Sequence, residues 1–287
     1  MRVISVPMHC FASNCYLVAS EKGNCAVIDP VLDFDNKSGR TLTTSVDKVI
    51  DFIKSEKWTV KYIIETHAHA DHLSAAPYIK QNLGGELVIG KHIDKVQETF
   101  KKIFNLDMSF KTDASQFDIL TDEGSTLQMD NITITAMHVP GHTPADMAYQ
   151  FSDGEKLAVF VGDTIFAPDV GTARCDFPNG SAEELYDSIQ RLLALPDDAL
   201  LYLCHDYPPQ GRIHTPTATV MSEKQNNIHV KQGTTKAEFV KMRTDRDKTL
   251  PMPRLILPSV QVNINAGELP APEDNGVRYL KIPLNQL

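Results

Sequence analysis

The sequence lacks several features that would each point to a particular class of protein. No apolar run approaches the roughly 20 residues of a membrane-spanning helix. The first residues contain no apolar segment of the kind found in secretory signals. Basic residues are not in excess, because the formal net charge is −9, and this argues against nucleic acid and anionic membranes as partners. We therefore expect a protein that binds neither nucleic acid nor a membrane.

Cysteine is also sparse and is not arranged in pairs. The sequence contains five cysteines: Cys10, Cys15, Cys25, Cys175 and Cys204. They form no Cys-x-x-Cys motif, and their number is odd. This pattern suits a reducing compartment better than a disulfide framework. We expect a cytoplasmic protein whose thiols remain free.

The remaining composition is that of an ordinary globular protein, with 42% hydrophobic and 23% charged residues among 287. Short apolar runs alternate with segments of helical spacing, in the order strands, helix, strand, helix, then strands, helix, strand. This order indicates an α/β (α+β) fold in which helices cover two sheets, a four-layer arrangement. We predict a main domain over residues 1–230. Residues 231–287, helical at first and then rich in proline, are predicted to form an extension packed on it.

The most informative segment is Thr66-His-Ala-His-Ala-Asp-His72, which follows a short apolar run predicted to be a buried strand. It contains four ligand-type residues: His67, His69, Asp71 and His72. Imidazole nitrogen and carboxylate oxygen are ligands that zinc and iron use in proteins. Where a strand turns into a loop, successive side chains can point into one cavity, whereas a helix would separate residues two apart. Four such residues in one loop therefore indicate a metal site.

Three further ligand-type residues also stand at the ends of predicted strands: His142 in Pro-Gly-His-Thr, Asp163 in Gly-Asp-Thr and His205 in Cys-His-Asp. Each motif alone is weak, since histidine and Gly-Asp are common in turns. Together with the first loop they provide enough ligands for two adjacent ions. One ion could be held by His67, His69 and His142, and a second by Asp71, His72 and His205, with Asp163 between them.

In this order, the Thr-His-x-His-x-Asp-His loop, Gly-His-Thr, Gly-Asp and the last histidine resemble the motifs of the metallo-β-lactamase superfamily. The resemblance implies a four-layer αββα sandwich with its metal site at one edge. Class B lactamases usually carry cysteine where this chain has Asp163. The aspartate makes the chain more similar to the glyoxalase II and persulfide dioxygenase branches of the superfamily.

A narrower resemblance, to the persulfide dioxygenases (sulfur dioxygenases), covers residues 1–230. It is carried by Ile28–Asp33, Thr66–His72, Pro140–Pro144, Gly162–Thr164, Arg174–Phe177 and His205–Tyr207. The end of the chain, with Leu257–Asn263 and Pro272–Gly276, is similar to bacterial β-lactamase-like hydrolases of sulfide-responsive operons. The chain is thus expected to be a persulfide dioxygenase with a longer C-terminal extension.

The resemblance implies one Fe(II) per chain, bound by His67, His142 and Asp163. Two histidines and one carboxylate on one face of an iron ion leave positions open for substrate and oxygen. The other ligand-type residues, His69, Asp71, His72 and His205, would then surround this triad and hold it through hydrogen bonds.

The resemblance also implies a substrate and the residues that meet it. The substrate would be glutathione persulfide, or a similar thiol persulfide, which O2 oxidises to sulfite. Arg174 would bind the glutathione part, and Tyr207 would lie beside the reacting sulfur. A homodimer or larger assembly is implied as well.

The residues themselves leave a hydrolase open. In a zinc enzyme, one or two Zn(II) ions lower the pKa of water, and the hydroxide attacks a thioester (as in glyoxalase II), a lactone or a lactam. Asp71 would then be a ligand or a proton shuttle. Spacing alone favours this alternative, because a single iron does not need all seven residues as ligands. A third class, a non-catalytic protein that binds metal or persulfide, would hold metal without turning over any substrate.

Overall fold

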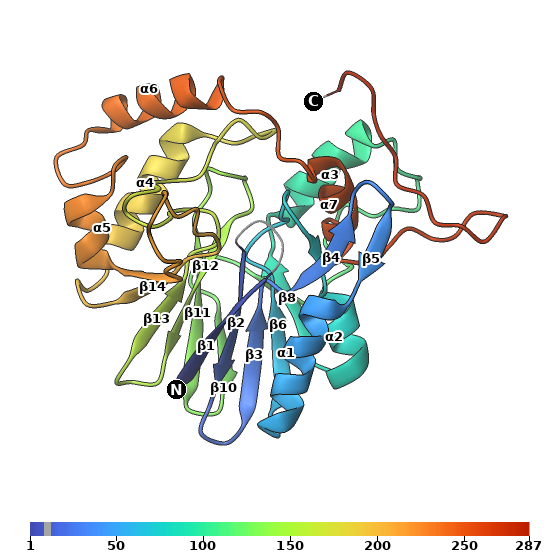
Figure 1. Ribbon diagram of the computed structural model, residues 1–287, viewed down its shortest axis with the longest axis horizontal. Coiled ribbons are helices and arrows are strands. Elements are labelled where there is room, and N and C mark those ends of the chain that lie inside the picture. The colour runs from blue at the N-terminus through green and yellow to red at the C-terminus, as the bar shows by residue number, and fades with distance from the viewer. Residues whose placement is uncertain (9–12, 287) are drawn as a thin grey trace.

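The computed structural model describes residues 1–8 and 13–286 (Figure 1). Its first sheet has six strands in the order β1-β2-β3-β6-β8-β9. Their bounds are β1 Arg2–Pro7, β2 Asn14–Ala19, β3 Asn24–Ile28, β6 Thr59–Ile64, β8 Glu86–Gly90 and β9 Ile119–Thr121. β1, β2 and β3 pair antiparallel, whereas β3, β6, β8 and β9 pair parallel. The central parallel strands are largely buried, which explains their nearly continuous apolar sequences.

The second sheet also has six strands, in the order β10-β11-β12-β13-β14-β15. Their bounds are β10 Thr126–Met129, β11 Ile132–His138, β12 Met147–Ser152, β13 Leu157–Phe160, β14 Leu200–Tyr202 and β15 Thr217–Thr219. Neighbours are antiparallel except for β13 and β14, which run parallel. A small third sheet contains β5 (Arg40–Leu42), β4 (Val31–Asp35) and β7 (Leu73–Ser74).

The two large sheets pack face to face, and helices cover their outer faces (Figure 1). Tyr16, Ile64, Tyr149 and Phe160 belong to the apolar layer between the sheets. The helices on the first sheet are α1 (Thr44–Ser55), α2 (Ala76–Leu83) and α3 (Ile93–Ile103). Those on the side of the second sheet are α4 (Ala182–Leu193), α5 (Val220–Asn226) and α6 (Lys236–Asp247). This arrangement confirms the four-layer αββα sandwich.

Local sequence signals explain where these helices begin. α1 buries four apolar side chains at helical spacing. α4 follows Ser181, whose side-chain oxygen accepts a hydrogen bond from the backbone N–H of Glu184. α6 begins with a capping box formed by Thr235 and Glu238. Among the described residues, no helix is both long and apolar enough to cross a membrane.

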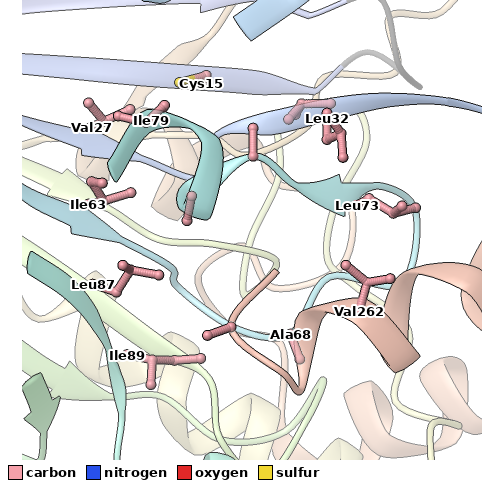
Figure 2. Close-up of a cluster of buried hydrophobic side chains, with 14 of the residues drawn as sticks. Cys15, Val27, Leu32, Ile63, Ala68, Leu73, Ile79, Leu87, Ile89 and Val262 are labelled. Atoms are coloured by element: carbon pink, nitrogen blue, oxygen red, sulfur yellow. The ribbon is translucent and has the colours of Figure 1, made fainter. Parts of the chain in front are cut away.

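The proline-rich segment near the C-terminus contains a further helix, α7 (Ile256–Asn263). Sequence periodicity does not reveal it, because α7 is short and buries residues on most of its sides. Val262 joins the apolar cluster that also contains Ala68 and Leu73, and Figure 2 shows the three residues in one region of that cluster. The extension therefore contributes to the core beneath the metal-binding loop. The domain boundary at residue 230 stays a prediction.

Candidate metal centre

The seven ligand-type residues lie in loops that follow four strands. The loop after β6 carries His67 to His72, and His142, Asp163 and His205 follow β11, β13 and β14. β11 and β13 both run antiparallel to β12, and β14 is parallel to β13, so these three strands end at one edge. The backbone N–H of Met147 donates to the carbonyl of Thr66 and joins the first loop to this edge.

Three of these residues come together as one group. The ligand atoms of His67, His142 and Asp163 all lie within 4.8 Å of one another. Oδ2 of Asp163 is 3.9 Å from Nε2 of His67 and 3.7 Å from Nε2 of His142. These separations are too long for hydrogen bonds. An ion about 2.0–2.2 Å from each atom fits between atoms this far apart.

Hydrogen bonds fix which nitrogen of each histidine faces this group. Nδ1 of His142 donates to the carbonyl of Arg174 at 2.7 Å. The hydroxyl of Thr66 donates to Asp29, so Nδ1 of His67 donates to that hydroxyl at 3.0 Å. Both rings therefore turn Nε2 toward Asp163. Burial lowers the pKa of His67 well below its usual value, so its imidazole is neutral, as a metal ligand must be.

His205 lies on the other side of Asp163. Its Nε2 is 3.3 Å from Oδ1 of Asp163 and 3.5 Å from Oδ2 of Asp71. Burial lowers the pKa of His205, but the two carboxylates raise it more, and the result is well above the usual value. Ser13 contacts both Nδ1 of His205, at 3.3 Å, and Asp71, at 3.2 Å. His205 and Asp71 are thus placed to hold a proton beside the triad.

His69 is oriented by two buried carboxylates. Its Nε2 is 3.0 Å from Oδ1 of Asp29 and 3.5 Å from Oε2 of Glu65. Burial lowers the pKa of His69, but Asp29 raises it more, to well above the usual value. Its ring lies between those of His67 and His72, with centroids 4.0 and 4.1 Å away. The ligand atoms of His69 lie within 4.8 Å of those of Asp29 and Glu65, and also of those of Asp71 and His72.

These positions bear on the three sets of metal ligands that the sequence suggests. Within the described part of the chain, the ligand atoms of the set expected for one iron, His67, His142 and Asp163, lie within 4.8 Å of one another. Among the described residues, the two sets expected for a pair of ions do not form such groups: His67, His69 and His142, and Asp71, His72 and His205. Three buried ring nitrogens nevertheless have no hydrogen-bond partner there: Nε2 of His67, Nδ1 of His69 and Nε2 of His72. Buried polar atoms without partners are costly, and bound metal would satisfy them. The donor set therefore fits a metal ion.

A cavity of about 520 Å³ opens beside this group. Asp71, His142, Asp163 and His205 are among its lining residues. Its walls are mostly apolar and include Phe166, Val170, Phe177, Ile228, Leu250 and Pro253. The volume lies in the range of small-molecule sites. A substrate of this size would reach the proposed metal position.

Both residues expected to meet the substrate line this cavity. Tyr207 is 47% exposed, and its ring stacks on that of His205 with centroids 5.5 Å apart. Arg174 is not a free cation, because Nε and Nη2 donate to Asp176 at 2.6 Å and Nη1 donates to the carbonyl of Pro251. Its guanidinium thus holds the cavity wall together. A role in substrate binding stays a prediction for both residues.

Two cavity residues were not foreseen from the sequence. Arg246 and Arg254 line the cavity and are exposed. Neither forms an ion pair with any other residue within 1–8 and 13–286. Arg246 also contributes to lowering the pKa of His229, next to the cavity residue Ile228. No sequence motif marks these arginines, because they reach the cavity from α6 and from the segment before α7.

One carboxylate behind the cavity wall should make stability depend on pH. Glu223 is fully buried and accepts a hydrogen bond from Asn227, which also donates to the carbonyl of Gly171. Its other oxygen has no hydrogen-bond partner among the described residues. Burial raises the pKa of Glu223 to about 8. Because the folded-state pKa exceeds the unfolded value of about 4.3, the stabilisation is complete below that value and is lost as pH rises to about 8.

We expect the isosteric Glu223→Gln to remove this dependence. Above about pH 8, where the wild type carries a buried charge, the variant should unfold at a higher urea concentration than the wild type. Near pH 5 the two urea midpoints should differ little. Urea unfolding followed by circular dichroism at both pH values measures the effect. An equal change at both pH values would contradict the assignment.

Comparison with known families agrees with this geometry. Residues 9–205 match the family model described as the metallo-beta-lactamase superfamily. The chain belongs to the metallo-beta-lactamase superfamily. The matched segment contains all seven ligand-type residues, so the metal-binding groups described here are those typical of a metallo-beta-lactamase superfamily enzyme.

Named relatives of this superfamily member extend over nearly the whole chain. A probable metallo-hydrolase of Burkholderia pseudomallei is 54% identical and covers 94% of both chains. Glyoxylase B2 of Dictyostelium discoideum is 48% identical, over 94% of this chain and 92% of its own. The crystal structure of ETHE1 from Myxococcus xanthus is 26% identical with a TM-score of 0.73, over 93% of this chain and 100% of that one. The protein is therefore a metal-dependent enzyme of the superfamily.

Proposed function

We propose that this protein is a persulfide dioxygenase with one non-haem Fe(II) per chain. One observation carries the proposal: His67, His142 and Asp163 bring their ligand atoms together, whereas His69 turns its Nε2 to Asp29. Two histidines and one carboxylate with open positions are characteristic of Fe(II) oxygenases.

In the proposed reaction, the outer sulfur of the persulfide is oxidised by four electrons and O2 accepts them. Both oxygen atoms end on that sulfur, water attacks it, the S–S bond breaks, and sulfite and the thiol leave. Iron, when bound, would supply the electron transfer between sulfur and oxygen. The chain's own residues do the rest: they hold the ion, orient the substrate and take up protons.

Each of these tasks has a candidate in the cavity. Asp71 and His205 lie 3.5 Å apart in the cavity lining, where the pair can hold a proton and pass it on during the attack of water. Tyr207 also lines the cavity, with its ring stacked on that of His205, where it can contact the sulfur. Phe166 and Phe177 line the walls and exclude water from the reacting atoms.

A second candidate, a zinc hydrolase of a thioester, lactone or lactam, has its own support. The names of the relatives from Burkholderia pseudomallei and Dictyostelium discoideum favour it over the dioxygenase. Nδ1 of His69 and Nε2 of His72 favour it too, because both lack a hydrogen-bond partner among the described residues and a second ion would satisfy them. Zinc, when bound, would lower the pKa of water so that hydroxide forms near neutral pH.

One experiment separates the two candidates. The protein is purified without oxygen, its metal is measured, and oxygen uptake is followed with glutathione persulfide. Near one iron per chain with rapid uptake supports the dioxygenase. Two zinc ions, no uptake and cleavage of S-lactoylglutathione or a lactone support the hydrolase. Bound metal without turnover of any of these substrates would overturn both and leave a binding protein.

A persulfide dioxygenase and a thioester hydrolase both need a site for the carboxylates of a glutathione-type substrate. We propose that Arg246 and Arg254, which have no ion-pair partner in the described residues, bind them. Replacement of either arginine by alanine should raise KM about ten-fold with kcat little changed, since a charged hydrogen bond stabilises both ground and transition state. Steady-state kinetics with glutathione persulfide test this. Lys248→Ala, a nearby cation outside the cavity lining, is the control, and equal effects would contradict the assignment.

The cytoplasmic location, the homodimer or larger assembly and the thiol carrier stay predictions. The proposed partners are a small thiol persulfide and O2, with no nucleic acid and no membrane.

A further inference from the structure

The C-terminal helix α7 ends at Asn263, and the side chain of this residue reaches the metal-binding loop. Asn263 is 5% exposed and stands 194 positions from His69 in the sequence. Its oxygen accepts a hydrogen bond from the backbone N–H of Ser74 at 2.8 Å. Its Nδ2 donates to the carbonyls of His69 and His72, each at 2.8 Å. One amide group therefore uses both its N–H groups and its oxygen on a single loop.

A chain of side-chain contacts continues from the same point to His69. The hydroxyl of Ser74 donates to one oxygen of Glu65, and the other oxygen of Glu65 is 3.5 Å from Nε2 of His69. Asp29 holds the same nitrogen from the other side. The backbone position of Ser74, which Asn263 fixes, thus helps to set the direction of the His69 ring.

α7 is itself held firmly enough to act as an anchor. Val262 is fully buried in the core cluster. The side chain of Gln97 in α3 donates to the carbonyl of Ile264 at 2.9 Å. Gly267, just beyond the helix, packs so closely on Pro77 that an added Cβ would lie 2.6 Å from its Cδ. Asn263 is therefore a fixed donor and acceptor rather than a flexible surface group.

We propose that Asn263 is a positioning residue of the metal centre, through which the C-terminal extension sets the strength of metal binding. It acts on the backbone of the segment from His69 to Ser74 and through that on the histidine rings. The inference rests on the metal centre proposed above and applies equally to iron and to zinc.

The test is the affinity of the full chain for Zn(II), measured by competition with a chromophoric chelator. Asn263→Asp keeps the acceptor for Ser74 but turns an oxygen toward two carbonyl oxygens. Asn263→Ala removes all three bonds without adding charge. We expect metal affinity to fall about 10–100-fold in both, as on loss of other outer partners of metal ligands. Asn265→Asp is the matched control, because the side chain of Asn265 donates to the carbonyl of Glu268, away from the loop, and the affinity of this variant should equal that of the wild type.

Thermal unfolding of the metal-free proteins separates positioning from general stability. If the Asn263 variants unfold at a lower temperature but bind Zn(II) as tightly as the wild type, Asn263 contributes only to stability and the inference fails. If the wild type binds no metal, the proposed metal centre fails, and this outcome is distinct from a failure of the inference about Asn263.

A measurement on the wild type alone covers the case in which the variants do not fold. Coupling between two sites is reciprocal, so metal binding should stabilise the contact that Asn263 makes. Amide hydrogen exchange at Ser74 and along α7 should slow when Zn(II) binds. Unchanged exchange in both places would overturn the inference.

Discussion

His142→Ala is expected to lose bound iron and oxygen consumption together. His142 presents Nε2 to the space beside Asp163 because its Nδ1 is tied to the carbonyl of Arg174. The substitution removes one of three proposed ligands, so the loss in affinity should exceed the roughly 10–100-fold effect of losing an outer hydrogen-bond partner. Metal analysis of the purified variant and an oxygen electrode with glutathione persulfide measure both quantities.

His138→Ala is the control for this prediction. His138 precedes the same loop, and its ring contacts the carbonyl of Pro144 instead of Asp163. The His138→Ala variant should keep its bound iron and its oxygen consumption. Retention of iron and oxygen uptake in His142→Ala would remove His142 from the ligand set and with it the iron triad.

Arg243→Met should cause the largest loss of stability outside the metal centre. Arg243 in α6 is 1% exposed and pairs with Asp247, which is 5% exposed. The arginine also donates to the carbonyl of Thr172, and Asp247 accepts from the backbone N–H of Cys175. Removing one partner of a buried pair leaves the other charge uncompensated, which costs about 3–5 kcal/mol. The free energy of unfolding from urea titrations measures this cost.

The matched control lies on the same helix. Lys241 and Asp245 form an exposed pair with the same i, i+4 spacing, and such pairs contribute little to stability. Lys241→Met should therefore leave the urea midpoint unchanged. If Arg243→Met behaved in the same way, the buried pair would not connect α6 to the segment that carries Thr172 and Cys175.

Much of the fold could be predicted because local signals and tertiary packing agree in α1, α4 and α6. α1 carries one apolar stripe, and α4 begins after Ser181, whose sequence Ser-Ala-Glu-Glu is typical of a helix start. α7 could not be predicted in the same way, because Pro258 lies within it and its buried residues are not confined to one stripe. Its helical state depends on the core that surrounds it.

The ligand-type residues of the site could be recognised because their chemistry is unusual for packing. The direction of each ring could not, because it depends on residues distant in sequence. His69 is turned by Asp29, 40 positions earlier, and Arg174 is occupied by Asp176 and by the carbonyl of Pro251. Arg246 and Arg254 were missed for the same reason: nothing near them in sequence indicates that they meet the cavity.

The packing of α7 has a consequence for synthesis on the ribosome. Val262 shares a cluster with Val27 of β3 and Leu73 of β7, so segments that are translated far apart in time meet in one core. Contacts between such distant segments form slowly, because a long loop must close first. The nascent protein therefore exposes part of this apolar surface until translation has passed α7. During that interval it is a natural client for chaperones that shield apolar surface.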